Sequence, residues 1–420
     1  MHMMRVIWLE TRRSPLRWWL PLFVVLNLAI LFGRSTSWIG VWPQASAAAQ
    51  LGGYALTAMA GAAGSWCAGR EHRSGTNGML SASWRSRWQA DFAQFSSTVL
   101  YVGVPYLIGA GAAAIVSAGE AGPGFLWPGY LLLGAGTLLL STAAGHLAGK
   151  YLVGKFAPTV AIAVLILVFG MFGSRRLELF VLSGMPQEEV LAPALTARII
   201  LALAVAAAAV LLPGRLSGGA SWNRLRRLSK VTITVAAVAG CIVVAGAAGP
   251  LRATRPAPAV PLCNAQKPRV CMWPDHRKYL PEIAAMAGRL TKLPSGLFKV
   301  PDTFYERGVQ PNAAPSSGFL LINEVFSVPD ALAGDVMENT FRACDFPDER
   351  ADDYYEQNFS MKQWLAVHAY GAKFPNYIQG GPEDIDMAEI YRVTRQPDAQ
   401  QAAWVRARVA ALKAIDPGCA

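Results

Sequence analysis

The chain has 420 residues, of which 53% are hydrophobic and 15% are charged, and its formal net charge is +11. The positive excess lies in residues 1–250, which carry 19 Lys and Arg against 7 Asp and Glu, whereas residues 251–420 carry 19 against 20. Because this charge belongs to the apolar half, it indicates attraction to anionic lipid headgroups and gives no support for nucleic-acid binding.

Seven long apolar segments fill the first half of the chain. Each is close to the roughly 20 residues that a helix needs to cross a bilayer, and a backbone in lipid must satisfy its own hydrogen bonds. The sequence therefore predicts an all-α polytopic membrane protein with about seven transmembrane helices, the first six forming a bundle over residues 18–213. The segments cover residues 18–33, 46–69, 92–118, 126–148, 157–173, 195–213 and 231–249.

Lys and Arg are unequally distributed between the two ends of these segments. With a cytoplasmic N-terminus, the inner segments hold 15 of them, and the outer loops and helix ends hold four. Lys and Arg accumulate on the cytoplasmic side of membrane proteins. We therefore expect residues 251–420 to be extracytoplasmic. The abundance of Ala, Gly and Arg is typical of a GC-rich genome, which favours a bacterial plasma membrane.

The first 17 residues combine apolar and basic side chains. Trp8 and Leu9 adjoin Arg12 and Arg13, and Pro15 follows. This pattern predicts a short helix in the plane of the membrane interface, with its arginines toward lipid phosphates. The alternative is a basic leader that only sets the topology.

The first inner loop, residues 69–91, has an unusual order of side chains. A charged cluster leads into Gly75 and Thr76, the apolar pair Met79 and Leu80 follows, and arginines come next. Thr76 is a suitable cap for a short helix that exposes the apolar pair. A solvated positive loop would explain the arginines but not this order, so we interpret the loop as a docking element for a cytoplasmic partner.

This pattern resembles the cytoplasmic loop of ABC-2 type transporter permeases, and the similarity extends over roughly residues 1–213. In that family the loop is a coupling helix that docks into a separate ATPase subunit. The sequence departs from the family pattern in having Glu71 as its only leading acidic residue and residues 81–83 in place of a proline. The resemblance assigns coupling to the ATPase to Glu71, Gly75, Thr76, Met79, Leu80, Arg85 and Arg87.

The resemblance also concerns the outer loop at residues 174–194. In ABC-2 permeases this region forms short helices that re-enter the outer leaflet, which implies such a role for Phe180, Val181 and Leu182. The alternative is a loop packed on the protein surface, and the sequence does not choose between the two.

The apolar segments hold almost no charge, so no proton or ion relay is visible in them. Residues 145–151 superficially resemble a phosphate-binding loop, but the spacing is one residue short and Ser or Thr is missing after Lys150. We therefore expect Lys150 to be a snorkelling lysine that sets topology. The chain encodes no ATPase and no cofactor site, and ATP and Mg would bind to the partner subunit.

The remaining chain divides by composition. We predict a basic cytoplasmic loop at 214–230, the seventh span at 231–249, a Pro-rich linker at 250–262 and a mostly helical domain at 263–420. A short apolar run at 318–323 is a candidate strand. Helical patterns cover residues 279–291, 330–342, 351–370, 384–394 and 398–415.

The last domain carries four of the six cysteines: Cys263, Cys271, Cys344 and Cys419. Their restriction to one compartment predicts two disulfides in oxidising surroundings. Three pairings are compatible with the sequence. We favour Cys263–Cys271 with Cys344–Cys419, and free thiols are the alternative.

We find no catalytic or metal-binding pattern in the last domain. His276 and His368 are its only histidines, and neither has a second ligand at helical spacing. Ser316 and Ser317 lack the context of a nucleophile elbow. We therefore predict no metal site and no catalytic site.

The leading hypothesis is the permease subunit of an ATP-binding cassette exporter. Its partners would be a cytoplasmic ABC ATPase, a second permease copy or paralogue, and membrane lipids, with no nucleic acid. The alternative is a membrane-anchored receptor or sensor with an extracytoplasmic ligand-binding domain, and a membrane enzyme comes third. The transported substrate is not apparent from the sequence.

Overall fold

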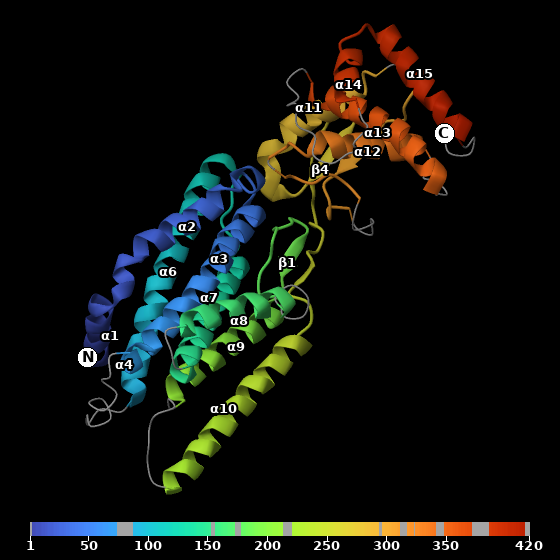
Figure 1. The fold of residues 1–420 in the computed structure, drawn as a ribbon. Helices are drawn as coiled ribbons and strands as arrows, with labels where there is room; N and C mark the ends of the chain where they lie inside the picture. The colour runs from blue at the N-terminus through green and yellow to red at the C-terminus, as the bar shows by residue number, and fades with distance from the viewer. Residues whose placement is uncertain are drawn as a thin grey trace. The chain divides into compact units, whose positions relative to one another are not determined.

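The structure is a computed structural model, and it describes residues 2–73, 87–152, 156–172, 178–212, 221–293, 296–310, 317–322, 324–341, 348–371 and 386–415. The chain is mostly helical and forms two compact units. Unit 1 comprises Met1–Glu120 and Phe125–Thr254, and unit 2 comprises Ala121–Gly124 and Arg255–Ala420 (Figure 1).

Unit 1 is built from helices and one pair of short strands. Pro21, Pro43, Pro128 and Pro193 each stand in the first turn of a helix, where the missing N–H has no intrahelical acceptor to lose. The helices are α1 (His2–Arg13), η1 (Pro15–Trp18), α2 (Leu20–Phe32), η2 (Ser35–Ser37), α3 (Trp42–Ala68), α4 (Arg70–Arg73), α6 (Arg87–Glu120), α7 (Pro128–Tyr151), α8 (Ala157–Phe172), α9 (Ala192–Leu211) and α10 (Ser221–Ala247).

Three helices among the described residues are long and apolar enough to cross a membrane, namely those at Trp88–Glu120, Pro128–Tyr151 and Ala192–Leu211. Shorter apolar helices cover Leu20–Phe32, Ala157–Leu167 and Val231–Ala247. The 27-residue α3 is also long enough, and it is rich in the small residues Gly, Ala and Ser. Large apolar side chains on the outer faces are exposed, as expected of surfaces that face lipid: Leu107, Ile115, Ile166, Leu203 and Val243.

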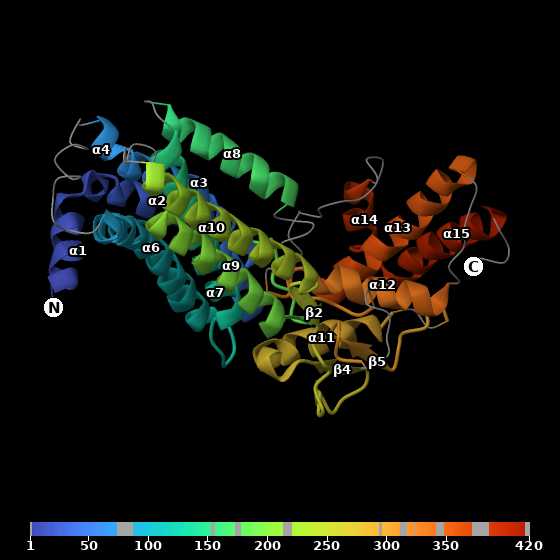
Figure 2. The ribbon, with the colours of Figure 1, turned by 90° about the horizontal axis from the view of Figure 1, so that it is seen from below.

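Helix α3 is the centre of unit 1 and packs against α7, α6 and α8, while α10 runs along α9 (Figure 2). Small residues allow this contact: a Cβ on Gly145 would lie 2.0 Å from the carbonyl oxygen of Gly61, and one on Gly149 would lie 2.3 Å from that of Ser65. The backbones of α3 and α7 therefore approach each other closely over several turns, which is the packing that small residues favour in membrane helices.

A second close contact surrounds Asn27, the polar residue in the middle of α2. Asn27 is 1% exposed, and its Nδ2 donates to the carbonyl oxygen of Pro105 at 2.8 Å. A Cβ on either Gly52 or Gly109 would collide with the Asn27 amide. Asn27 thus links α2 to α6 in a space that only glycines leave open.

The two strands of unit 1 join its last segment to the region before α9. Strand β1 (Glu188–Val190) pairs antiparallel with β2 (Arg252–Thr254), with Glu189 opposite Ala253. Leu251 is fully buried, its carbonyl accepts from Leu191 N at 2.9 Å, and its N–H donates to Glu178. The segment that follows α10 is therefore fastened to unit 1 before the chain enters unit 2.

Unit 2 combines a small sheet with helices. The sheet has the order β3-β4-β5. The central strand β4 (Arg269–Met272) is antiparallel to β3 (Leu262–Cys263) and parallel to β5 (Thr303–Tyr305). The helices are η3 (Pro274–Tyr279), α11 (Leu280–Leu290), α12 (Val328–Thr340), α13 (Asp348–Tyr370), α14 (Met387–Val393) and α15 (Asp398–Ile415).

Helix α13 is central to unit 2, since it contacts α11, α12, α14 and α15. Its Trp364 and Leu365 are fully buried, and the indole Nε1 of Trp364 donates to Gln401 Oε1 at 3.2 Å. On the sheet side, Trp273 and Phe304 are each 1% exposed. These three aromatic residues therefore belong to the core of the domain.

The described residues differ from the sequence-based expectations in four places. The all-α class is incomplete, because both units contain strands. Of the run 318–323, the described residues 318–322 form no strand apart from one bridge between Phe319 and Glu306. The segment 214–230 is helical from Ser221 onward, since residues 221–230 contain neither Gly nor Pro. Residues 252–254 of the expected linker are strand β2.

Candidate functional site

The loop that was expected to dock an ATPase falls largely outside the described residues. Gly75, Thr76, Met79, Leu80 and Arg85 all lie in residues 74–86, which the structure does not describe. Glu71 lies in α4, which ends just before this segment, and Arg87 begins α6 just after it. The coupling assignment therefore stays a prediction.

The helices on either side of this loop are both bonded to α1. Arg70 Nη2, in α4, lies 2.5 Å from Glu10 Oε1, and the hydroxyl of Tyr101, in α6, donates to the carbonyl oxygen of Thr11 at 2.7 Å. Trp8 and Leu9 of α1 are exposed, and the guanidinium of Arg12 lies 4.3 Å from the centroid of the Trp8 ring. An amphipathic helix with exposed Trp and Arg suits a membrane interface.

Lys150 is buried at the C-terminal end of α7, where its Nζ lies 2.7 Å from Asp91 Oδ2 of α6. The same Nζ donates to the carbonyl oxygens of Ala209 at 2.7 Å and Leu212 at 3.1 Å, at the end of α9. Carbonyls in a last helical turn lack intrahelical partners. The Lys150 ammonium donates hydrogen bonds to two of them and forms an ion pair with the Asp91 carboxylate at the same time. The prediction of a snorkelling Lys150 is therefore wrong: this lysine joins α6, α7 and α9.

The outer segment with Phe180, Val181 and Leu182 is extended, and residues 178–187 contain no helix in the part of the chain described here. Val181 is buried and its N–H donates to Gln50 Oε1 of α3 at 2.8 Å. The Phe180 ring lies 4.2 Å from that of Tyr54, whereas Leu182 is exposed. These contacts correspond to a loop packed on the bundle, the alternative to short re-entrant helices.

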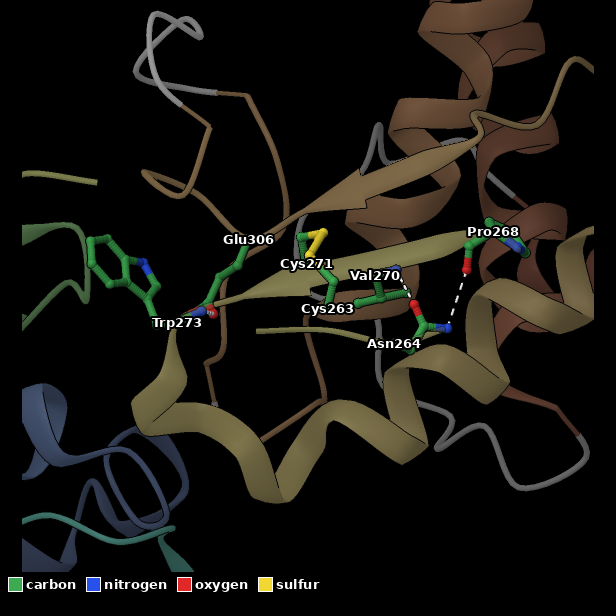
Figure 3. Close-up of a disulfide and its surroundings, with 7 residues drawn as sticks. All are labelled: Cys263, Asn264, Pro268, Val270, Cys271, Trp273 and Glu306. Atoms are coloured by element: carbon green, nitrogen blue, oxygen red, sulfur yellow. Dashed lines mark hydrogen bonds between the residues drawn. A yellow bond between two sulfur atoms is a disulfide. The ribbon is translucent and has the colours of Figure 1, made fainter. Parts of the chain in front are cut away.

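Cys263 and Cys271 form a disulfide between neighbouring positions of β3 and β4 (Figure 3). The turn between them is held by Asn264, whose Oδ1 accepts from Val270 N at 2.6 Å and whose Nδ2 donates to Pro268 O at 3.4 Å. The favoured first pairing is thus present. Cys344 and Cys419 lie outside the described residues, so their pairing stays a prediction.

A buried ion pair lies beside this sheet. His276 Nδ1 is 2.6 Å from Glu306 Oε1, and the side chains are 4% and 0% exposed. The other oxygen, Glu306 Oε2, accepts from Trp273 N at 2.9 Å (Figure 3). Burial lowers the pKa of His276, but the charge of Glu306, its hydrogen bond and the charge of Asp275 outweigh burial, so this pKa is raised. The sequence offered no local signal for this pair.

No group of three His, Cys, Asp or Glu side chains in the described ranges converges as metal ligands do. The residues that resembled a phosphate-binding loop lie in α7, and Gly145 and Gly149 face the backbone of α3. The sequence resemblance there reflects helix packing.

Comparison with known proteins gives one match. Residues 270–414 match a family model described as a domain of unknown function, DUF7224. No curated protein matches the chain, and no solved structure matches it. The match lies within unit 2 and brings no activity with it.

Proposed function

We propose that the chain is the permease subunit of an ATP-binding cassette exporter, driven by a separate ATPase that docks on residues 71–87. The observation that supports this best is the bonding of α1 to both helices that flank the loop, through Glu10 with Arg70 and Tyr101 with Thr11. Because α4 and α6 are both bonded to α1, a force applied to the loop between them would move all three helices together.

The Lys150–Asp91 pair supports the same proposal, because Asp91 lies near the start of α6, one turn after Arg87. Motion of this part of α6 passes directly to α7 and α9 through the Lys150 ammonium. Rigid-body movement of packed helices is a common way to transmit a conformational change. The ATPase would bind ATP and Mg, and a second permease copy or paralogue would complete the path.

The proposed topology has seven spans, with the N-terminus in the cytoplasm of a bacterium and unit 2 outside its plasma membrane. The Lys and Arg distribution of the sequence supports the orientation. The disulfide between Cys263 and Cys271 also suits an oxidising compartment.

A membrane-anchored receptor is the second candidate, and the β1–β2 pair favours it. This pair fastens the chain that follows α10 to the residues just before α9, as a sensor domain that signals through the bundle would need. In that case loop 71–87 would have no ATPase to bind.

The decisive experiment replaces Met79 and Leu80 by Asp. Burying two such side chains in a partner groove contributes on the order of 3–5 kcal/mol before ordering costs. The variant should insert normally in the membrane, lose its ATPase on purification and lose substrate-stimulated ATP hydrolysis. Leu225→Asp with Leu228→Asp, an equal change in the later basic segment, should retain the ATPase. A Met79→Asp, Leu80→Asp protein that keeps its ATPase and transports normally would overturn the assignment of coupling to this loop. A wild-type protein that purifies from its native membrane without an ATPase would reject the exporter proposal in favour of the receptor.

A further inference from the structure

Unit 2 contains a cavity of about 420 Å³, a volume within the range of small-molecule sites, roughly 300–1,000 Å³. Its described lining comes from β5 and the residues around it at 301–310, the chain at 317–318 and one face of α12. All of these lining residues belong to the stretch that the DUF7224 model matches. The cavity therefore lies between the last strand of the small sheet and a helix.

The buried carboxylate of Glu306 belongs to this lining, but it is closed to a ligand. One of its oxygens lies 2.6 Å from His276 Nδ1, the other accepts from Trp273 N at 2.9 Å, and the side chain is 0% exposed. Glu306 therefore holds the wall of the cavity in place, and any binding must come from other groups.

Strand β5 uses only one of its two edges to join the sheet. Toward β4, Asp302 O accepts from Arg269 N at 2.8 Å, and the N–H of Glu306 also donates in that direction. Backbone groups of successive strand residues point to alternate edges, so those of Thr303 and Tyr305 point away from β4. Among the described strands β5 is the last of its sheet, so this second edge is able to pair with a further strand.

The chain itself pairs with part of this second edge. Phe319 N donates to Tyr305 O at 3.0 Å, and Arg307 N donates to Phe319 O at 2.9 Å. Gly318 makes this approach possible, because it has a φ of +90° and a Cβ there would lie 2.5 Å from Tyr305 O. The edge thus already accepts one added residue in the parallel sense, and its position is set before any ligand enters.

Three backbone groups remain on the second edge: the N–H and C=O of Thr303 and the N–H of Tyr305. Within the part of the chain that the structure describes, none of the three has a hydrogen-bond partner. Both residues are half-buried and both line the cavity. Because backbone polar groups away from bulk water are nearly always paired, these groups call for a partner. Donors and an acceptor at strand spacing match the backbone of an extended peptide, which is known to add to sheet edges in other domains.

The wall opposite β5 bears on the side chains that such a peptide would carry. Asp335 is half-buried and Glu338 exposed, and their spacing of three residues places them on one face of α12. No Lys, Arg or His is among the described lining residues, while Arg307 acts on Asp335 from outside the lining. Every second side chain of an added strand points to the same side, so one set of them would meet these carboxylates.

We propose that this cavity binds an extended peptide that adds to the second edge of β5 and turns Lys or Arg side chains toward α12. Main-chain hydrogen bonds with Thr303 and Tyr305 supply the affinity, and the two carboxylates of α12 select basic side chains. A sugar or a simple amine lacks the alternating backbone groups that this edge matches. The site does not rest on the exporter proposal, since it lies wholly within unit 2 and a receptor would use it equally.

The test is isothermal titration calorimetry of the full-length protein in a neutral detergent. The probe is the peptide Lys-Val-Lys-Val-Lys, acetylated and amidated at its ends, and we expect saturable binding at one site per chain. The same peptide with every backbone nitrogen methylated cannot donate to Thr303 O and should bind at least about tenfold more weakly. The peptide Glu-Val-Glu-Val-Glu should also bind at least about tenfold more weakly, because like charges meet at α12.

A variant of the protein tests the edge from the other side. Thr303→Pro removes one N–H from the second edge and leaves the pairing with β4 intact, because proline is tolerated where the N–H of an edge strand points outward. It should weaken binding of the lysine peptide by about tenfold or more. The matched control is Thr303→Val, which keeps the backbone N–H, removes the hydroxyl and should bind the peptide as the wild type does.

The proposal is overturned if the wild type shows no saturable binding, if the methylated peptide binds as tightly as its parent, or if Thr303→Val weakens binding as much as Thr303→Pro does. Equal binding of the glutamate peptide would overturn the selection of basic side chains by α12. The peptide comparisons use the wild-type protein, so their outcome does not depend on how well a variant folds.

Discussion

Glu306 holds its carboxylate between His276 Nδ1 at 2.6 Å and the backbone N–H of Trp273 at 2.9 Å, with both side chains of the ion pair inside the core of unit 2. The pair joins η3 to the residue after β5, which are 30 residues apart in the chain. A buried pair of this kind is sensitive to the loss of either charge.

The first prediction concerns pH. The groups that act on His276 are Glu306, Asp275 and Arg255, and together with burial they leave its pKa raised. His276 therefore binds its proton more tightly in the folded unit than in the unfolded chain. The stability that protonated His276 contributes is complete below about pH 6.5 and is lost as the pH rises through its folded pKa. The slope should reach at most about 1.4 kcal/mol per pH unit.

The measurement is a urea titration of the full-length protein at several pH values, read by pulsed hydrogen exchange of peptides from residues 269–306. His276→Gln should remove the decrease above pH 6.5. Burial raises the pKa of Asp335 to about 6, so protonation of this carboxyl stabilises the folded protein as the pH falls from about 6 to 3.8. Asp335→Asn should remove only this second pH dependence. If the His276→Gln variant still loses stability above pH 6.5, that loss belongs to another titrating group.

The second prediction concerns the Lys150–Asp91 pair, whose side chains are 6% and 10% exposed. Lys150→Met leaves a buried carboxylate and unsatisfied carbonyls, so it should destabilise unit 1 by about 3–5 kcal/mol. Adding Asp91→Leu should recover part of the loss. The measurement is thermal unfolding in detergent, followed by size-exclusion chromatography.

The control is Arg70→Ala, which breaks the more exposed Arg70–Glu10 pair and should cost less than about 1 kcal/mol. Equal losses for the two variants would mean that burial of the Lys150 ammonium is not what makes this contact important.

The third prediction concerns topology. A cysteine at Thr291, which is exposed in unit 2, should react with a membrane-impermeant thiol reagent in intact cells. A cysteine at Arg5, exposed on α1, should react only after permeabilisation. Labelling of the wild-type cysteines is subtracted from both. The reverse pattern, or labelling of both cysteines only in permeabilised cells, would exclude the seven-span arrangement.

The fourth prediction compares two glycines of unit 2. Gly318→Ala forces a side chain into a positive φ and against Tyr305 O, and it should destabilise the unit by about 1–3 kcal/mol. Gly288→Ala is its control, because Gly288 lies within α11 and a Cβ there meets nothing within 4 Å. That change should be neutral or stabilising by up to about 1 kcal/mol. Similar urea midpoints for the two variants would show that the turn at Gly318 tolerates a side chain.

Much of the secondary structure was predictable because its signals are local. The helical patterns at 279–291, 330–342 and 398–415 correspond to α11, α12 and α15, since periodicity and first-turn prolines act within a few residues. Cys263 and Cys271 are eight residues apart, so their pairing needed only one tight turn. The strands escaped prediction because two to four residues are too few to show an alternation.

Local signals in the chain were sufficient to place the apolar helices, to show how charge divides between the two halves of the chain, and to favour the Cys263–Cys271 pair. Contacts between distant parts of the chain became visible in the folded protein alone: Lys150 meets Asp91 across 59 residues, His276 meets Glu306 across 30, and residues of β5 and α12 line one cavity. Helix formation depends on neighbours a few residues away. Ion pairs and cavities depend on which distant surfaces pack together, and that outcome is set by the fit of whole helices.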